Sequence, residues 1–349
     1  MILRNLYGFT LEELETEMEA LGQKKYRAKQ IFSWLYVKNV SKIDDMSDIS
    51  LKFREVLKEK FCLVKPSIFV KKESIDGTIK LLLKLCDDHR IETVLMPYNY
   101  GNAVCISTQV GCNMGCAFCA SGLLKCNRNL SVAELVGQVI VINDILRNEG
   151  KKPISHVVLM GTGEPFNNYD SVMRFIKIIN SQFGLSIGAR HITVSTSGVI
   201  PGILKYGKEG LQINLAISLH APNDTLRQKI MPIAKAYPLD KLMDAIKQYS
   251  IDSNGRRVTF EYLLIDGFND SEECCNELIK LIKPTFGYVN LIPYNEVMEN
   301  KFKRPSNIKI HRFHDKLMKC GIKTTIRKEF GADIEAACGQ LRAKYASKS

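Results

Sequence analysis

The chain has 349 residues, 45% of them hydrophobic and 25% charged, which is ordinary for a globular protein with one large and one small domain. Lys and Arg outnumber Asp and Glu by 49 to 37, and residues 301–349 alone hold 13 basic and 4 acidic side chains. This surplus favours a polyanionic partner, although a solvated basic tail would give the same count. With no run of about 18 apolar residues and no secretory signal, we expect no membrane contact and a cytoplasmic location.

Residues 1–72 predict a small helical accessory domain. Apolar side chains recur at helical spacing in three segments: 11–22, 25–39 and 50–61. The second segment has a basic face that either contacts the polyanionic partner or faces water, and this face is formed by Lys25, Arg27 and Lys29. Residues 73–102 contain two strand-like runs around a polar turn, which predicts a hairpin that leads into the main domain.

Residues 103–349 predict one large main domain, because strand-like and helix-like runs alternate along them. Strands are expected at 103–108, 155–161, 191–198, 214–220, 257–265 and 288–294. Helices are expected at 131–147, 170–181, 238–250, 272–282 and 307–320. Such alternation implies right-handed crossovers and a parallel sheet. Six units are too few for a closed eight-stranded barrel, so we predict a partial (β/α)6 barrel of the α/β class, with an open doubly wound sheet as the alternative. Either fold places ligands at the carboxyl ends of the strands.

Three of the eleven cysteines form the strongest chemical signal. Cys112, Cys116 and Cys119 follow a predicted strand with the spacing C-x3-C-x2-C. Thiolates are the usual ligands of iron-sulfur clusters, and three of them leave one iron of a cubane open to bind another molecule. A structural zinc site would need a fourth ligand, for which His191 or His220 is available. Cys126 is close by but lies outside the motif, and we expect it not to bind iron.

The same segment resembles the signature of the radical S-adenosylmethionine (SAM) superfamily, C-x3-C-x-aromatic-C, with Phe118 at the aromatic position. The resemblance implies a 4Fe-4S cluster on Cys112, Cys116 and Cys119, whose open iron binds the amino and carboxylate groups of SAM. It also implies an external one-electron donor such as flavodoxin or ferredoxin, because SAM is cleaved reductively to a 5′-deoxyadenosyl radical.

Further segments resemble the RlmN family over most of the chain, from YRAKQIFSWLY to AACGQL. In chain order they are CISTQVGCNMGCAFCAS, VVLMGTGEPFNN, TVSTSGVIP, LAISLHAPND, MPIAKAYPL, VNLIPYN and AACGQL. This family methylates carbon 2 of an adenine in 23S ribosomal RNA and, in some members, in tRNA, with two SAM molecules per turnover. The related Cfr enzymes methylate carbon 8 and tend to read Gly-Glu-Ala where this chain has Gly163-Glu164-Pro165, so the resemblance favours RlmN.

The chemistry of carbon 2 fits a radical mechanism. This atom lies between two ring nitrogens and is electron-poor, so it cannot attack the methyl group of SAM as a nucleophile. A carbon radical can add to it, and the cofactor would supply that radical while the protein supplies position and proton transfer.

Polar residues that close the predicted strands are the candidate SAM ligands. Glu164 lies in a glycine-containing loop after a strand, where its carboxylate would repel a phosphate but suits an ammonium group. Taken singly, each of the others would be interpreted as a turn residue. The resemblance implies SAM contacts at Gly163, Glu164, Ser195, Ser218, Leu219, His220 and Asn295.

Three more residues gain a role only from the resemblance. Cys338, which alone is typical of a small core residue, becomes the thiol that SAM methylates first. Its methyl group then loses a hydrogen to the 5′-deoxyadenosyl radical and attacks the adenine. Cys105, otherwise a buried strand cysteine, is implied to attack the sulfur of Cys338, which forms a disulfide and releases the product. Glu92, otherwise an exposed strand residue, is implied to be the general base that removes the proton from carbon 2.

Two other functions remain compatible with the residues themselves. One is a radical SAM enzyme that acts on a protein or small molecule, and the other is a zinc-binding RNA protein without catalytic activity. The first has no need for the basic surplus or for the pair formed by Cys105 and Cys338, and iron and sulfide analysis separates the second from both enzymes. If the substrate is RNA, we expect the N-terminal domain and the basic C-terminal segment to grip its phosphates, with a strong salt dependence.

Overall fold

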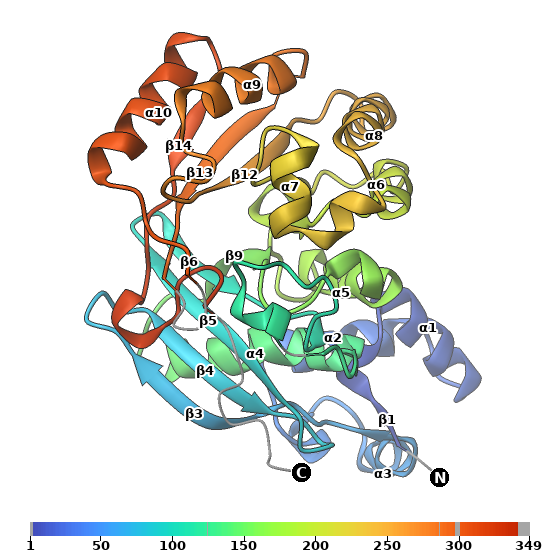
Figure 1. Ribbon diagram of the computed structural model, residues 1–349. Helices are drawn as coiled ribbons and strands as arrows, with labels where there is room; N and C mark the ends of the chain where they lie inside the picture. Colours follow the sequence, from blue (N-terminus) through green and yellow to red (C-terminus); the bar gives the residue numbers. More distant parts are fainter. Residues whose placement is uncertain (1–2, 124, 286, 297–300, 341–349) are drawn as a thin grey trace.

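The computed structural model describes residues 3–123, 125–285, 287–296 and 301–340. A ten-stranded sheet forms its centre, in the order β14-β13-β12-β11-β10-β9-β6-β5-β4-β3 (Figure 1). Its outer strands, β14 (Thr324–Ile326) and β3 (Ser67–Glu73), are not paired with each other in this described part of the chain. The sheet is therefore open, which confirms the prediction of a partial barrel.

All six predicted strands of the main domain are present and pair in parallel with one another. They are β6 (Gly101–Cys105), β9 (Ile154–Leu159), β10 (Ile192–Thr196), β11 (Asn214–Ser218), β12 (Val258–Leu264) and β13 (Tyr288–Pro293). β14 adds a seventh parallel strand. The sequence analysis missed it because its three residues contain no extended apolar run.

Helices connect these strands. They are α4 (Val132–Asn148), α5 (Tyr169–Asn180), α6 (Ile200–Gly207), α7 (Asp224–Ile230), α8 (Leu239–Asp252), α9 (Glu272–Ile282) and α10 (Asn307–Lys319). The sequence analysis missed α6 and α7, which are short. α6 contains Pro201 in its first turn. Backbone N–H groups in the first turn have no partner within the helix, so the missing N–H of proline costs no hydrogen bond there. α4 begins with a capping box between Ser131 and Glu134, which satisfies two otherwise unpaired backbone N–H groups.

The other end of the sheet is antiparallel. β4 (Ile79–Lys84) and β5 (Arg90–Tyr98) form the expected hairpin, and β5 pairs with β6 of the main domain. β3 begins at Ser67, within the residues that we assigned to the helical domain, and pairs with β4. The hairpin is thus part of the main sheet. Most side chains of β3 are exposed, and charges such as Lys71 and Lys72 discourage this edge from pairing with another chain.

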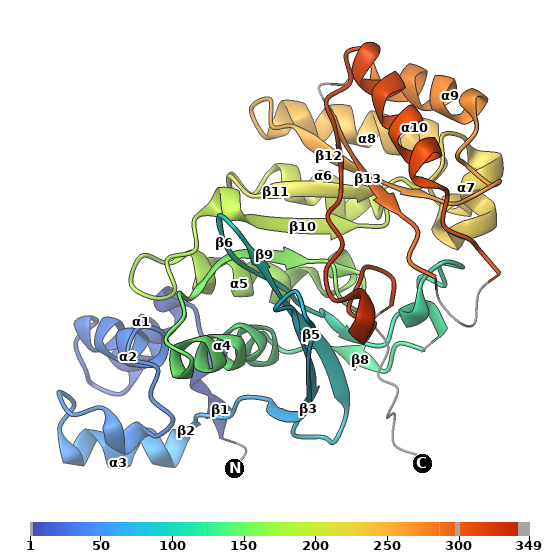
Figure 2. The same cartoon turned by 90° about the vertical axis from the view of Figure 1, so that its left-hand side faces the viewer.

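The N-terminal region consists of the three predicted helices, α1 (Leu11–Ala20), α2 (Tyr26–Tyr36) and α3 (Leu51–Lys60). Two short strand pairs lie outside the main sheet: β1 (Arg4–Asn5) with β2 (Phe61–Cys62), and β7 (Gln109–Val110) with β8 (Arg128–Asn129). Figure 2 shows α1 to α3 beside α4, on the far side of the molecule from α9 and α10. An ion pair between Lys65 and Asp144 joins this region to α4.

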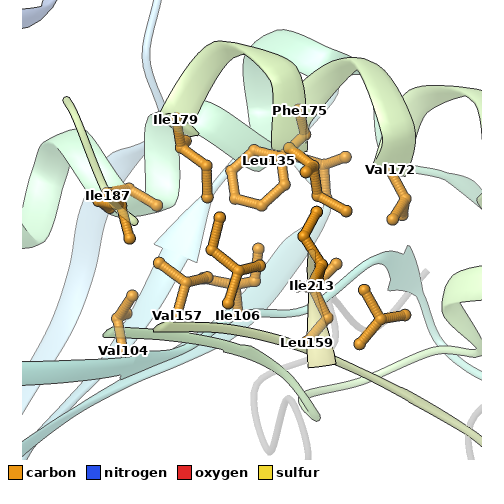
Figure 3. Packing of buried hydrophobic residues seen from close by; sticks show 14 of the residues in the cluster. Val104, Ile106, Leu135, Val157, Leu159, Val172, Phe175, Ile179, Ile187 and Ile213 are labelled. Carbon is orange, nitrogen blue, oxygen red and sulfur yellow. The ribbon is translucent and has the colours of Figure 1, made fainter. Parts of the chain in front are cut away.

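The core lies between the sheet and its covering helices. Val104, Val157 and Leu159 face α4 and α5, where they contact side chains such as Leu135 and Phe175 (Figure 3). Burying each of these side chains stabilises the fold by roughly 2 kcal/mol. Because side chains alternate along a strand, the residues between them point to the inside of the partial barrel. None of the described helices is long and apolar enough to cross a membrane.

Candidate active site

A cavity lies at the carboxyl ends of the parallel strands, as the fold class predicts. It brings together the cysteine loop that follows β7, the ends of β9 to β13, and the segment after β14. Of the residues proposed from the sequence, the cavity is lined by Cys112, Cys116, Cys119, Gly163, Glu164, Ser195, Ser218, His220 and Cys338. Most of the expected site residues therefore lie together around one cavity, although they span more than 220 residues of sequence.

The cysteine loop has a fixed backbone. A Cβ atom on Gly111, which has φ +79°, would collide with the carbonyl oxygen of Lys125, so only glycine allows this close approach. The N–H of Ala117 donates to the carbonyl of Ile230 at 2.9 Å, and the N–H of Ala120 donates to the carbonyl of Gly339 at 2.8 Å. The second bond links the loop directly to the residue that follows Cys338.

The three thiols of this loop fit an iron-sulfur cluster better than a zinc ion. Burial raises the pKa of Cys112 to about 11 and also raises the pKa of Cys116 and of Cys119, so a bound cation is needed to keep them as thiolates. Within the described residues, no three His, Cys, Asp or Glu side chains converge on a point where one metal ion could bind. In a cubane each thiolate binds a different iron, so separated sulfur atoms are suitable.

The candidate fourth zinc ligands do not support a zinc site either. His191 precedes β10, at the opposite end of that strand from the cavity, and its ring stacks on His156 at 4.2 Å. His220 does line the cavity, but its Nδ1 accepts a hydrogen bond from the N–H of Leu263 at 3.1 Å. Burial lowers the pKa of His220 to about 3, so the ring is neutral and carries its proton on Nε2.

Glu164 lies in the loop after β9, where Gly163 has φ +112°. Its side chain is buried, and one carboxylate oxygen accepts hydrogen bonds from both the N–H and the hydroxyl of Ser197 at 2.7 Å. The other oxygen accepts from the N–H of Phe166 at 3.1 Å. Burial raises the pKa of Glu164, and the bonds from Ser197 oppose this effect. The carboxylate is thus held at the cavity wall, where it can also accept from a ligand ammonium.

The remaining expected SAM contacts differ in their positions. Ser195 and Ser218 end β10 and β11 and line the cavity. Leu219 is fully buried and is absent from the cavity lining; its N–H donates to the carbonyl of Glu261 at 3.0 Å. Asn295 lines a smaller adjoining cavity, and its Nδ2 donates to the carbonyl of Cys338 at 3.2 Å.

Cys338 and Cys105 lie near each other, although 233 residues separate them in the sequence. Cys338 lines both cavities. Cys105 is buried inside the partial barrel in one apolar cluster with Ala336. Burial, with a smaller contribution from the neighbouring sulfur of Cys338, raises the pKa of Cys105 to about 12. All eleven cysteines belong to the described part of the chain, and all are free thiols.

Comparison with known proteins identifies the family. Residues 4–63 match the ribosomal RNA large subunit methyltransferase N-terminal domain, and residues 106–278 match the radical SAM superfamily. A protein of Spiroplasma citri named "Probable dual-specificity RNA methyltransferase RlmN" is 52% identical over 342 residues, which cover 98% of each chain. A protein of the same name from Staphylococcus saprophyticus is 50% identical over 98% of this chain and 93% of its own. This chain belongs to the RlmN family. A solved structure of a radical SAM methyltransferase from Sphaerobacter thermophilus has a TM-score of 0.92 and 44% identity, over 98% of this chain and 100% of that chain.

In this member of the RlmN family, Glu92 is buried rather than exposed. Its carboxylate pairs with Lys80 at 3.0 Å inside the antiparallel part of the sheet, and it does not line the larger cavity. Its backbone carbonyl accepts from the hydroxyl of Ser107 at 2.7 Å. Lys80 also donates to the carbonyl of Glu335, three residues before Cys338. Through this shared lysine, Glu92 lies close to the segment of Cys338 and not among the expected SAM contacts.

The sequence analysis missed a buried pair at the cavity wall of this RlmN-family protein. Arg327 Nη1 lies 3.7 Å from Glu261 Oε2, which also accepts from Asn290 Nδ2 at 2.8 Å. Burial raises the pKa of Glu261, and the neighbouring Cys338 is the main reason that the pKa of Arg327 is raised. A glutamate in the middle of the apolar strand 257–265 was the signal that could have revealed this pair.

A second buried arginine was also missed. Arg227 of α7 is fully buried, and its guanidinium donates to the carbonyls of Ser197 at 2.7 Å and of Leu219 at 3.2 Å. It thereby joins the loops after β10 and β11, both of which contribute to the cavity. Burial lowers its pKa to about 10, which still leaves it charged at neutral pH. The sequence offered no signal, because a polar helix of seven residues does not indicate which side chain is buried.

Proposed function

We propose that this protein methylates carbon 2 of an adenine in RNA, with Cys338 as the carrier of the new carbon atom. Membership of the RlmN family makes it a SAM-dependent RNA methyltransferase with a radical SAM domain. The single observation that best supports the mechanism is the cavity that Cys338 shares with the three cysteines of the loop. Both sites of SAM chemistry, the thiol and the proposed cluster, would then be served by one pocket.

Cys112, Cys116 and Cys119 would hold the 4Fe-4S cluster. When bound, the cluster supplies the electron exchange that cleaves SAM reductively. Around it, the protein provides a buried carboxylate at Glu164 for the SAM ammonium and a neutral imidazole at His220. Gly163, Ser195, Ser218, Leu219 and Asn295 complete the proposed SAM contacts, of which Leu219 would contribute by placing its neighbours Ser218 and His220 at the cavity wall.

Cys338 would act twice, which requires two SAM molecules per turnover. Its sulfur would first attack the methyl carbon of one SAM: a carbon–sulfur bond forms, the bond from that carbon to the sulfonium breaks, S-adenosylhomocysteine leaves, and the thiol proton goes to solvent. The methyl group on Cys338 then gives a hydrogen atom to the 5′-deoxyadenosyl radical from the second SAM, and its carbon joins carbon 2 of adenine. Arg327 lies at the wall beside Cys338 and provides a fixed positive charge there.

Glu92 and Cys105 would complete the reaction. Glu92 would accept the proton that leaves carbon 2, and the unpaired electron left by the radical addition would return to the cluster. Cys105 would then attack the sulfur of Cys338, so that the disulfide forms, the carbon–sulfur bond breaks and the released carbon takes up a proton to become the methyl group. The electrostatic effect of Cys338 on Cys105 and the packing of Cys105 against Ala336, two residues before Cys338, support this step. The disulfide is a transient species in this proposal, and an external reductant would restore both thiols.

The RNA would be 23S rRNA, tRNA or both, bound in the cytoplasm, with flavodoxin or ferredoxin as the electron donor. Basic side chains of α10, such as Lys309 and Lys316, form exposed ion pairs with acidic residues of neighbouring segments. Exposed pairs are weak, so these cations stay available to RNA phosphates. Residues 341–349, the end of the basic segment 301–349, lie outside the described residues. On the N-terminal domain, Lys25 pairs with Glu19 at 3.6 Å and is similarly exposed.

Two substitutions test this function. Cys338→Ala should abolish methyl transfer to RNA but still permit reductive cleavage of SAM, because the proposed cluster ligands are unchanged. Cys105→Ala should accumulate a covalent protein–RNA species, visible on a denaturing gel. Cys320→Ala is the matched control, since this thiol is exposed at the end of α10. Full RNA methylation by Cys338→Ala or Cys105→Ala would refute the role assigned to that residue. Mass spectrometry of nucleosides, prepared separately from rRNA and from tRNA, distinguishes 2-methyladenosine from 8-methyladenosine.

A further inference from the structure

The segment that carries Cys338 crosses from β14 to the antiparallel part of the sheet (Figures 1 and 2). It is attached there to the turn between β3 and β4. The hydroxyl of Ser74 donates to Asp333 Oδ1 at 2.5 Å, and the N–H of Ile75 donates to Asp333 Oδ2 at 3.4 Å. In the opposite direction, the N–H of Gly331 donates to Asp76 Oδ2 at 3.0 Å. The turn between β3 and β4 and the segment that carries Cys338 each supply a carboxylate that accepts hydrogen bonds from the other, although more than 250 residues of sequence separate them.

A buried lysine makes a second attachment closer to Cys338. Lys80 of β4 donates from Nζ to the carbonyl oxygen of Glu335 at 2.8 Å and pairs with Glu92 at 3.0 Å. Its side chain is 9% exposed and that of Glu92 is 6% exposed. A hydrogen bond from a charged donor in such a poorly hydrated place is stronger than one at the surface. Lys80 therefore fixes the backbone three residues before Cys338.

The backbone of the segment has a shape that depends on these contacts. Gly331 and Glu335 both have left-handed φ angles, +61° and +54°. A Cβ atom on Gly331 would lie 2.7 Å from Ala336 Cβ and 2.9 Å from Thr78 Cγ2, so the segment packs closely against the start of β4. At Glu335 the conformation is unfavourable for a residue with a side chain, and the bond from Lys80 to its carbonyl helps to maintain it.

We propose that Ser74, Asp76 and Lys80 are positioning residues for Cys338, which hold its sulfur at the cavity where the SAM methyl group arrives. This inference rests on the proposed role of Cys338 as the methylated thiol. Methyl transfer needs the sulfur and the methyl carbon within about 3–3.5 Å of each other and aligned. If the sulfur is misplaced by about 1 Å, the rate can fall by about two orders of magnitude. None of the three residues lines the larger cavity, so they act on the rate of methyl transfer and not on SAM binding.

The test is the methylation of Cys338 itself, in full-length protein prepared with an unmodified thiol and its iron-sulfur cluster. SAM is added without reductant or RNA, and the mass of the intact protein is followed. Asp333→Ala, an exposed position, should lower the maximal rate constant for Cys338 methylation about fivefold to tenfold, while the SAM concentration that gives half of the maximal rate stays within about twofold. Lys80→Met should lower this rate constant further. Ser74→Ala should lower it and Ser74→Thr should restore it, because threonine keeps the hydroxyl donor.

Lys84→Met is the matched control. Lys84 lies four residues after Lys80 on β4, but it pairs with Asp88 at the opposite turn, away from Cys338. The rate constant for Cys338 methylation in Lys84→Met should equal that of the parent protein. Parent-like rates in Asp333→Ala and Lys80→Met would overturn the positioning role, as would an equal loss in Lys84→Met. Failure of the parent protein to methylate Cys338 at all would instead refute the proposed function, and this inference with it.

Discussion

The parallel strands β9 to β13 and the antiparallel strands β3 to β5 belong to one sheet, yet they contribute to the site in different ways. The parallel strands end in polar residues that line the cavity, such as Ser195 and Ser218. The antiparallel strands contribute no residue to the larger cavity, but Lys80 and Asp76 hold the segment that carries Cys338. One half of the sheet therefore lines the larger cavity, whereas the other half holds the segment that carries Cys338.

The largest expected effect concerns the parallel half. Cys116→Ala removes one proposed cluster ligand, so RNA methylation and SAM cleavage should both fall to background while the protein stays folded. Iron and sulfide analysis of anaerobically reconstituted protein checks the loss of the cluster. Cys126→Ala is the control, because this thiol is close in sequence but outside the cavity lining. One equivalent of zinc without sulfide in the parent protein would contradict the whole interpretation.

An intermediate effect is expected in the antiparallel half, at the buried pair of Lys80 and Glu92. Glu92→Ala leaves Lys80 without its carboxylate and should lower the free energy of unfolding by roughly 3 kcal/mol, measured by urea denaturation. Glu92→Gln should cost less, since its amide oxygen still accepts from Lys80. If Glu92 is also the base, both variants should lose RNA methylation and Glu92→Gln should retain methylation of Cys338. Unchanged stability of Glu92→Ala would contradict the importance of the pair.

The smallest expected effect is on how the free energy of unfolding depends on pH, through Asp76 in the turn between β3 and β4. Burial alone would raise the pKa of Asp76, but hydrogen bonds from Thr78 and Gly331 outweigh it and lower the pKa to about 2. A carboxyl with a lowered pKa in the folded state adds stability above its unfolded value near 3.8, and this stability disappears as the pH falls towards 2. Asp76→Asn should therefore be slightly less stable than the parent at pH 6, by under about 1 kcal/mol because Asp76 is exposed, and equal to it near pH 2. A constant difference at every pH would exclude Asp76 as the cause.

The two halves also differ in how well their structure could be predicted. The parallel strands were recognised because they are buried on both faces and form short apolar runs between turn residues. β14 and α7 were missed because they are too short for a periodic pattern, and β3 because most of its side chains are exposed. Arg227 and Arg327 were missed for another reason. Their burial depends on neighbours that are remote in sequence, such as Ser197 and Glu261.

The sequence by itself determined the cysteine loop, because three ligands within eight residues are held near one another by the chain. It also determined the order of strands and helices that puts polar residues at one edge of a parallel sheet. Only the tertiary structure decided that Cys338 meets this loop, that Cys105 lies beside it, and that Lys80 attaches its segment to β4. The physical reason is that such contacts depend on the curvature of an open sheet, which brings its two ends within reach of one crossing segment, and no local pattern of residues encodes that distance.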